Sequence, residues 1–168
     1  STGLMLIAEI IMRFTYIKAH YSDFVVLPLK ALFELSYNKW FISLNNINGT
    51  WQFQTLLFVL VLMFAVFLII GYKTKLSTFI LFLLVISAQN RNPIILQNSD
   101  IVIRLILFWG MFLPWGARYS LDAINGKYNN IKNYVISAGS ISYILQMLLI
   151  YVFAVQFKTG SEWHKDGT

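Results

Sequence analysis

The chain has 168 residues, of which 58% are hydrophobic, 17% aromatic and only 12% charged. A soluble domain carries about 25% charged residues, so this chain has about half the charge that a water-exposed surface requires. The composition argues against a soluble globule, a disordered chain and a disulfide-stapled secreted module. It leaves a single helical membrane domain over residues 1–168.

The net charge of +6 does not indicate nucleic acid as a partner, because the basic residues lie between apolar runs rather than in one patch. The absence of cysteine excludes thiol chemistry, cysteine-ligated zinc and disulfides. His20 and His164 lack the spacing of metal ligands, so no metal is expected. The chain starts inside an apolar run and stops without a terminal signal, and we expect it to be a domain of a longer protein.

Five stretches are candidates for membrane segments, since a spanning helix needs about 20 mostly apolar residues. In chain order they are Leu4–Tyr16, Phe53–Tyr72, Leu76–Ala88, Ile101–Trp115 and Tyr134–Phe157. The first is short, and we expect it to be truncated. The expected fold is therefore all-α, a polytopic transmembrane helical bundle with about five membrane segments in a lipid bilayer.

The connectors between the segments indicate how the bundle is arranged in the membrane. The first connector, Lys18 to Thr50, carries apolar residues at helical spacing, which predicts a helix lying in the membrane interface. The tight linker Gly71–Lys75 predicts an antiparallel hairpin between the second and third segments. Lysine and arginine are denser in the short loops on the side of this linker, so that side is expected to be cytoplasmic. The bacterial cytoplasmic membrane is the expected location.

Four charged residues lie in or beside the apolar segments, where insertion of each costs about 2.5–3.5 kcal/mol. Glu9 and Arg13 are four residues apart, which is the spacing of an ion pair on one helix. Asp100 and Arg104 repeat that spacing. One interpretation is structural: either each pair neutralises itself inside the bundle, or Asp100 caps the helix and Arg104 extends to the membrane interface. The other is a polar pocket for a head group or a proton path.

Lys158 follows directly after the last apolar segment, and Tyr151 lies on the same helical stripe. A lysine in this position commonly extends its amine to the membrane interface. The alternative is a lysine facing an apolar pocket, where desolvation leaves part of the amine neutral and able to act as a base. The sequence leaves both interpretations open.

Short motifs along nearly the whole chain also suggest a family. They are Tyr21-Ser22-Asp23, Val26-Leu27-Pro28, Gly71–Lys75, Asn90–Pro93 through Asp100 and Arg104, Phe108-Trp109, Phe112–Pro114, Ser120–Asp122, Tyr151–Lys158, Trp163 and Asp166-Gly167. In this order they resemble the horizontally transferred transmembrane (HTTM) domain family, which is related to the membrane part of vitamin K-dependent gamma-carboxylase.

The resemblance implies a helical membrane domain in which Lys158, five residues before Trp163, occupies the position of the carboxylase base. That lysine deprotonates a reduced quinone, so the implied cofactor is a vitamin K-like reduced quinone in an outward-facing pocket. The Glu9/Arg13 and Asp100/Arg104 pairs would form its polar floor, and a peptide or protein would be the substrate. The alternative function is a non-catalytic membrane module that acts as a partner subunit in peptide maturation or export.

Overall fold

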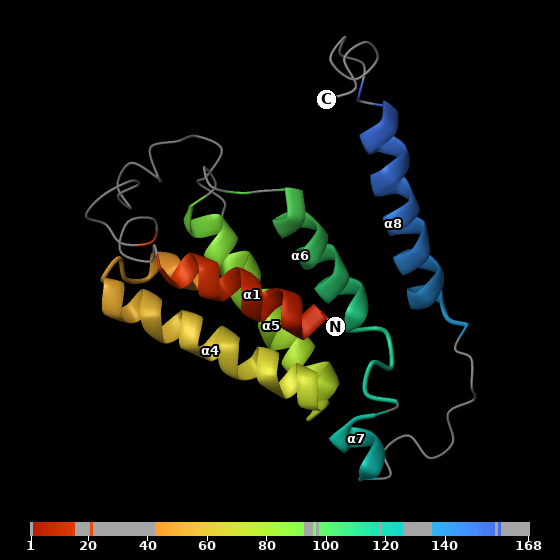
Figure 1. Ribbon diagram of the computed structural model, residues 1–168, viewed down its shortest axis with the longest axis horizontal. Helices are drawn as coiled ribbons and strands as arrows, with labels where there is room; N and C mark the ends of the chain where they lie inside the picture. The colour runs from red at the N-terminus through yellow and green to blue at the C-terminus, as the bar shows by residue number, and fades with distance from the viewer. Residues whose placement is uncertain are drawn as a thin grey trace. The chain divides into compact units, whose positions relative to one another are not determined.

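The computed structural model describes residues 2–15, 21, 43–92, 96, 98–117, 119–125, 136–156 and 158. These residues form six α-helices and one short 3-10 helix, with no strand among them, so the expected all-α class is confirmed (Figure 1). The elements are α1 (Thr2–Phe14), η2 (Leu44–Asn46), α4 (Trp51–Ile70), α5 (Thr74–Arg91), α6 (Asn98–Gly110), α7 (Leu121–Ile124) and α8 (Ala138–Gln156). They fall into two compact units, Ser1–Ile131 and Lys132–Thr168.

Two of the helices are long and apolar enough to cross a membrane. α4 has 20 residues and a mean hydropathy of 2.8, and α8 has 19 residues and a mean hydropathy of 1.9. At about 1.5 Å per residue, α4 is about as long as the ~30 Å hydrocarbon layer of a bilayer is thick. The helices α1 and α6 have 13 residues each, or about 20 Å by the same rise.

Each predicted segment contains a helix, but the boundaries differ. The third segment was predicted to end at Ala88, whereas α5 continues to Arg91 through polar residues that are buried inside the first unit. The fourth was predicted to reach Trp115, whereas α6 ends at Gly110, four residues before Pro114, which cannot continue a helix. Most of the expected interfacial helix lies outside the described residues. The described part of that connector, residues 21 and 43–50, contains η2.

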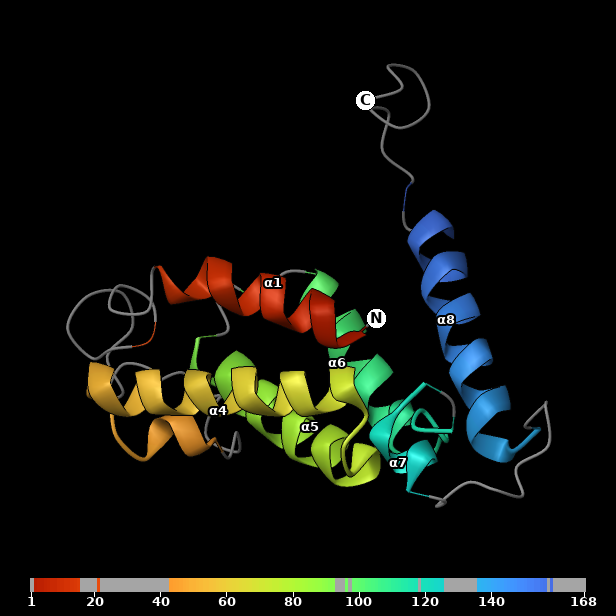
Figure 2. The ribbon, with the colours of Figure 1, turned by 60° about the horizontal axis from the view of Figure 1, so that its bottom comes forward.

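The first unit is built around α4 and α5, which lie side by side in opposite directions, as the Gly71–Lys75 linker predicts (Figure 2). α1 packs against α4, and α6 packs against α5. The shared core is apolar and its members come from all four helices and from residue 21: Leu6, Ile10, Tyr21, Leu57, Phe58, Val61, Ala65, Leu81, Leu84, Val85, Ile103 and Leu107.

Gly71 makes the hairpin between α4 and α5 possible. Its φ of +76° is left-handed, and its N–H donates to the Phe67 carbonyl over 2.9 Å, which ends α4. A Cβ at this position would lie 2.2 Å from the Cβ of Ser120. Both the backbone conformation and the close approach therefore require glycine here.

In the second unit, α8 begins where two serines cap it. The Ser140 N–H donates to the Ser137 hydroxyl over 3.2 Å, and the Ser137 N–H donates to the Ser140 hydroxyl over 2.9 Å. This reciprocal arrangement is a capping box, which satisfies free N–H groups at a helix start. It explains why the helix starts at Ala138, four residues after the predicted start of the last segment.

Candidate functional site

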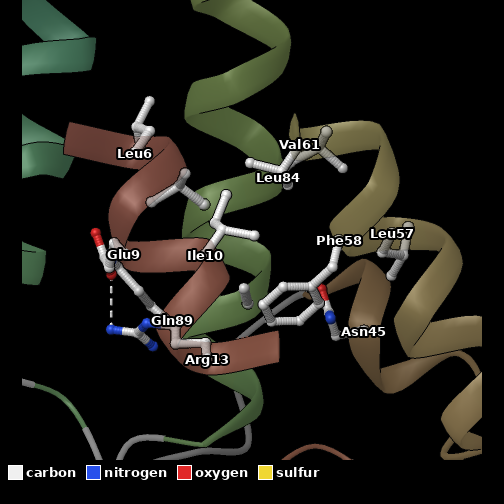
Figure 3. A pocket seen from close by; sticks show the side chains of 12 residues that line it. Leu6, Glu9, Ile10, Arg13, Asn45, Leu57, Phe58, Val61, Leu84 and Gln89 are labelled. Atoms are coloured by element: carbon white, nitrogen blue, oxygen red, sulfur yellow. Dashed lines mark ion pairs between the residues drawn. The ribbon is translucent and has the colours of Figure 1, made fainter. Parts of the chain in front are cut away.

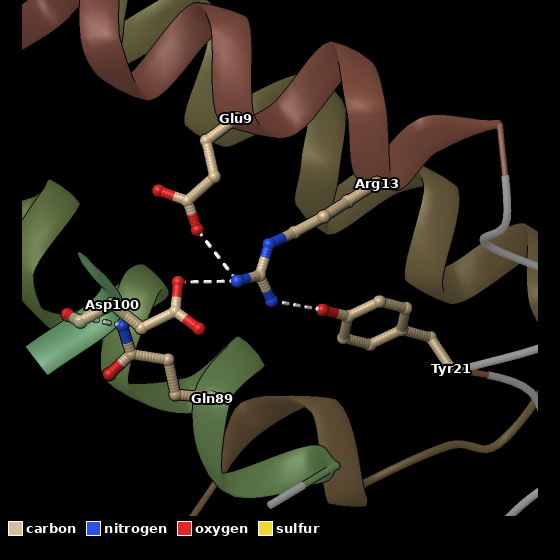
Figure 4. A network of polar contacts seen from close by, with 5 residues as sticks. All are labelled: Glu9, Arg13, Tyr21, Gln89 and Asp100. Carbon is tan, nitrogen blue, oxygen red and sulfur yellow. Dashed lines mark hydrogen bonds and ion pairs between the residues drawn. The ribbon is translucent and has the colours of Figure 1, made fainter. Parts of the chain in front are cut away.

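Arg13 is the centre of an ion-pair cluster between α1 and α6 (Figure 4). Its Nη2 lies 2.7 Å from Oε1 of Glu9, one turn earlier on α1, and the same nitrogen contacts Oδ1 of Asp100. Nη1 donates to the hydroxyl of Tyr21 over 2.7 Å. Two carboxylates and a phenol thus share one guanidinium. Burial raises the pKa of Tyr21, which keeps the phenol protonated.

The structure contains the predicted Glu9–Arg13 pair but pairs Asp100 differently from the sequence prediction. Asp100 is fully buried in the first turn of α6 and reaches across to Arg13 on α1, 87 positions away. Arg104 is half-buried on α6, and within the described ranges it forms no ion pair. Because α1 packs against α6, Asp100 pairs with Arg13 rather than with Arg104. Sequence spacing along one helix cannot reveal a pair between two helices.

Gln89 extends the cluster from α5. Its Nε2 donates to the main-chain carbonyl of Asp100 over 2.9 Å, and its side chain is almost completely buried. Its Oε1 is also buried and has no hydrogen-bond partner in the part of the chain that the structure describes. A buried acceptor without a partner costs about 1–3 kcal/mol, so this oxygen marks a place where a donor is missing.

A second polar network joins η2, α4 and α5 near the same end of the unit. Asn45 and Gln54 bond each other twice: Nδ2 of Asn45 donates to Oε1 of Gln54 over 2.6 Å, and Nε2 of Gln54 donates to the Asn45 carbonyl over 2.8 Å. The hydroxyl of Ser87 donates to Oδ1 of Asn45, and that of Ser43 to the Ser87 carbonyl. Sequence reasoning missed this network. Gln54 was its one visible signal, as an amide near the start of the most apolar segment.

A pocket lies between α1, α4 and α5 and connects the two networks (Figure 3). Its walls are apolar, and its polar end is formed by Glu9, Arg13, Asn45 and Gln89. The cavity volume is about 30 Å³, which is room for about two water molecules and far below the ~300–1,000 Å³ of pockets that enclose a whole small molecule. The pocket is therefore a narrow slot that is partly open on one side. The apolar wall residues are Leu6, Ile10, Leu57, Phe58, Val61, Leu84, Val85 and Ala88.

At the other end of α4 and α5, Asp122 fixes the hairpin. Its carboxylate accepts hydrogen bonds from the N–H of Lys73 at 3.0 Å and from the N–H and hydroxyl of Thr74 at 2.8 and 3.0 Å. Asp122 is buried, and its own N–H donates to the Gly71 carbonyl. It therefore caps the start of α5 from the first turn of α7. The motifs Gly71–Lys75 and Ser120–Asp122 meet here, and their role is structural.

The remaining predicted site residues belong to the second unit or lie outside the described residues. Tyr151 is on α8 and is 73% exposed. Lys158 follows α8 and is exposed, and its N–H donates to the Val155 carbonyl over 3.2 Å. Trp163 is not among the described residues. The pocket belongs entirely to the first unit.

No family model, curated protein or solved structure matches the chain.

Proposed function

We propose that this chain is a polytopic membrane domain whose five segments are α1, α4, α5, α6 and α8, and that it binds the polar head of an amphiphilic molecule in the pocket between α1, α4 and α5. The pocket carries the proposal, because it combines apolar walls with charged and amide groups at one end. Binding sites for small molecules have this composition.

The distribution of polarity in the first unit supports a lipid environment. Gln54, Arg91 and Asp100 are fully buried, whereas apolar side chains of α4 such as Leu56 and Val59 are about half exposed. Ionisable groups within membrane bundles characteristically face the interior and pair there. A water-soluble bundle would present the opposite arrangement.

A reduced quinone is the amphiphile that the family resemblance suggests, and the hydrogen-bonding and apolar groups of the pocket suit it. The free Oε1 of Gln89 can accept a hydrogen bond from a hydroxyl, and the apolar walls can contact one edge of a ring. When bound, a reduced quinone would supply an acidic hydroxyl whose deprotonation starts its reaction with oxygen. The narrow slot implies that only the hydroxyl-bearing edge enters and that the rest of the molecule extends through the mouth.

The family resemblance also suggests Lys158 as the base. A base must be neutral to accept the hydroxyl proton of a reduced quinone. Glu9 and Arg13 would orient the head of the molecule at the polar end of the slot. Trp163 and Tyr151 would flank the lysine along the chain. A peptide or protein is the proposed final substrate.

Mass spectrometry of the purified chain tests this function. The wild-type protein should carry a co-purifying quinone, and it should oxidise added reduced quinone in the presence of oxygen. Lys158→Ala should retain the bound quinone but lose turnover, whereas the exposed lysine variant Lys75→Ala, remote from the pocket, should behave as wild type. Filling the slot with Ala88→Leu should remove the quinone.

Two results would overturn the enzyme proposal. One is turnover by Lys158→Ala at the wild-type rate. The other is the absence of any quinone together with a protein that co-purifies stoichiometrically. The second outcome would support the non-catalytic module, a partner subunit in peptide maturation or export.

A further inference from the structure

One buried hydrogen-bond acceptor belongs to a residue at the polar end of the slot and has no partner in the described ranges. Gln89 lines the slot, and among the described lining residues its Oε1 is the one buried side-chain polar atom without a hydrogen-bond partner. The other half of this amide is fixed, because Nε2 donates to the Asp100 carbonyl over 2.9 Å. Gln89 is 3% exposed, so bulk water does not satisfy the oxygen.

Among the described residues that line the slot, Arg13 is the one cation, and its charge is already balanced. Nη2 of Arg13 contacts both Glu9 and Asp100, and Nη1 donates to Tyr21. Two carboxylates therefore surround one guanidinium. An anionic head placed here would meet an excess of like charge and would gain no free cation.

From these two observations we propose that the slot selects a single-chain or flat amphiphile whose head is an uncharged hydrogen-bond donor, a hydroxyl or amide N–H, through Oε1 of Gln89. An ammonium head fits less well, since its three N–H donors need three acceptors and the slot offers one unpartnered amide oxygen. The proposal rests on the binding pocket of the proposed function. It specifies the head group that the pocket accepts, independently of any quinone or of Lys158.

Four probes with the same ten-carbon tail separate the possible heads. They are decanol, decyl methyl ether, decanoate and decylammonium, each titrated into the whole chain in detergent micelles, with binding measured by native mass spectrometry. Decanol should bind about tenfold or more tightly than the ether, because the ether leaves Oε1 unsatisfied. It should also bind more tightly than decanoate and decylammonium.

Three variants test whether the preference for decanol over its ether depends on Oε1 of Gln89. Gln89→Leu keeps the size of the side chain but removes the acceptor, so decanol and the ether should bind within about threefold of each other. Gln52→Leu, an exposed amide on α4, should keep the wild-type ratio. Ala88→Leu keeps Gln89 and fills the slot, so it should abolish binding of all four probes.

The wild-type titrations decide the proposal even if Gln89→Leu does not fold. Equal affinity for decanol and its ether, or tighter binding of decanoate or decylammonium, would overturn the head-group selectivity while leaving the pocket in place. Failure of all four probes to bind would overturn both the selectivity and the pocket. Loss of quinone oxidation alone would bear only on the proposed enzyme.

Discussion

Replacing Arg13 with methionine is the most informative single perturbation of the charged cluster. Arg13 is the only cation that contacts Glu9 and Asp100 in the described part of the chain. The Asp100 side chain has no exposed area, and the Glu9 side chain is 20% exposed. Arg13→Met would leave two carboxylates close together and one of them fully buried.

The expected loss of stability is about 3–5 kcal/mol, the usual cost of removing one partner of a buried ion pair. A loss of 4 kcal/mol corresponds to a roughly thousandfold larger unfolding constant. Adding Asp100→Asn to Arg13→Met should recover much of the loss, since the amide carries no charge to compensate. Unfolding of the chain in mixed micelles, with increasing denaturing detergent, measures each value.

Arg104→Met is the matched control, because Arg104 is half-buried on the same helix as Asp100 and forms no ion pair within the described ranges. It should cost less than about 1 kcal/mol. A double-mutant cycle should give a coupling above about 1 kcal/mol for Arg13 with Asp100 and below about 0.5 kcal/mol for Arg104 with Asp100. Equal coupling energies in the two cycles would refute the contact between Arg13 and Asp100. They would favour the pair predicted along α6, Asp100 with Arg104.

Three further substitutions, the last with a matched control, address the packing of the first unit. Asp122→Ala removes the acceptor for two N–H groups at the start of α5 and should lower the free energy of unfolding by about 1–2 kcal/mol; amide hydrogen exchange should speed up there, and unchanged exchange would contradict the cap. Gly71→Ala should cost more than about 1 kcal/mol because of its φ of +76° and its contact with the neighbouring loop. Its melting temperature in detergent is the measurement, and a wild-type value would count against the tight hairpin. Phe58→Ala should cost about 3 kcal/mol by opening a cavity, whereas Phe79→Ala, 48% exposed, should cost well under 1 kcal/mol by the same unfolding assay.

The helices of this fold were visible in the sequence because their signals are local. Continuous apolar runs marked α4 and α8, and the Gly71–Lys75 linker marked the hairpin between α4 and α5. The end of α5 was predicted too early, at Ala88, whereas the helix continues to Arg91 and both Gln89 and Arg91 are buried. Polar residues extend a helix without difficulty when neighbouring helices cover them.

The candidate site was predictable only in part, because its contacts connect distant segments. The Glu9–Arg13 pair follows from a spacing of four on one helix. The contact from Arg13 to Asp100 and the bond from Gln89 to the Asp100 carbonyl depend on how α1, α5 and α6 pack. A single sequence contains no signal for such packing.

Helix geometry explains most of the cluster without invoking a ligand. Arg13 lies in the last turn of α1 and Asp100 in the first turn of α6, where a cation and an anion complement the respective helix dipoles. Both helices are shorter than α4, so their charged ends meet inside the unit, and the pairing neutralises them there. This structural explanation covers Glu9, Arg13 and Asp100. It provides no hydrogen-bond partner for Oε1 of Gln89. Buried charge alone therefore does not indicate a functional pocket here, whereas binding of a ligand at this oxygen would.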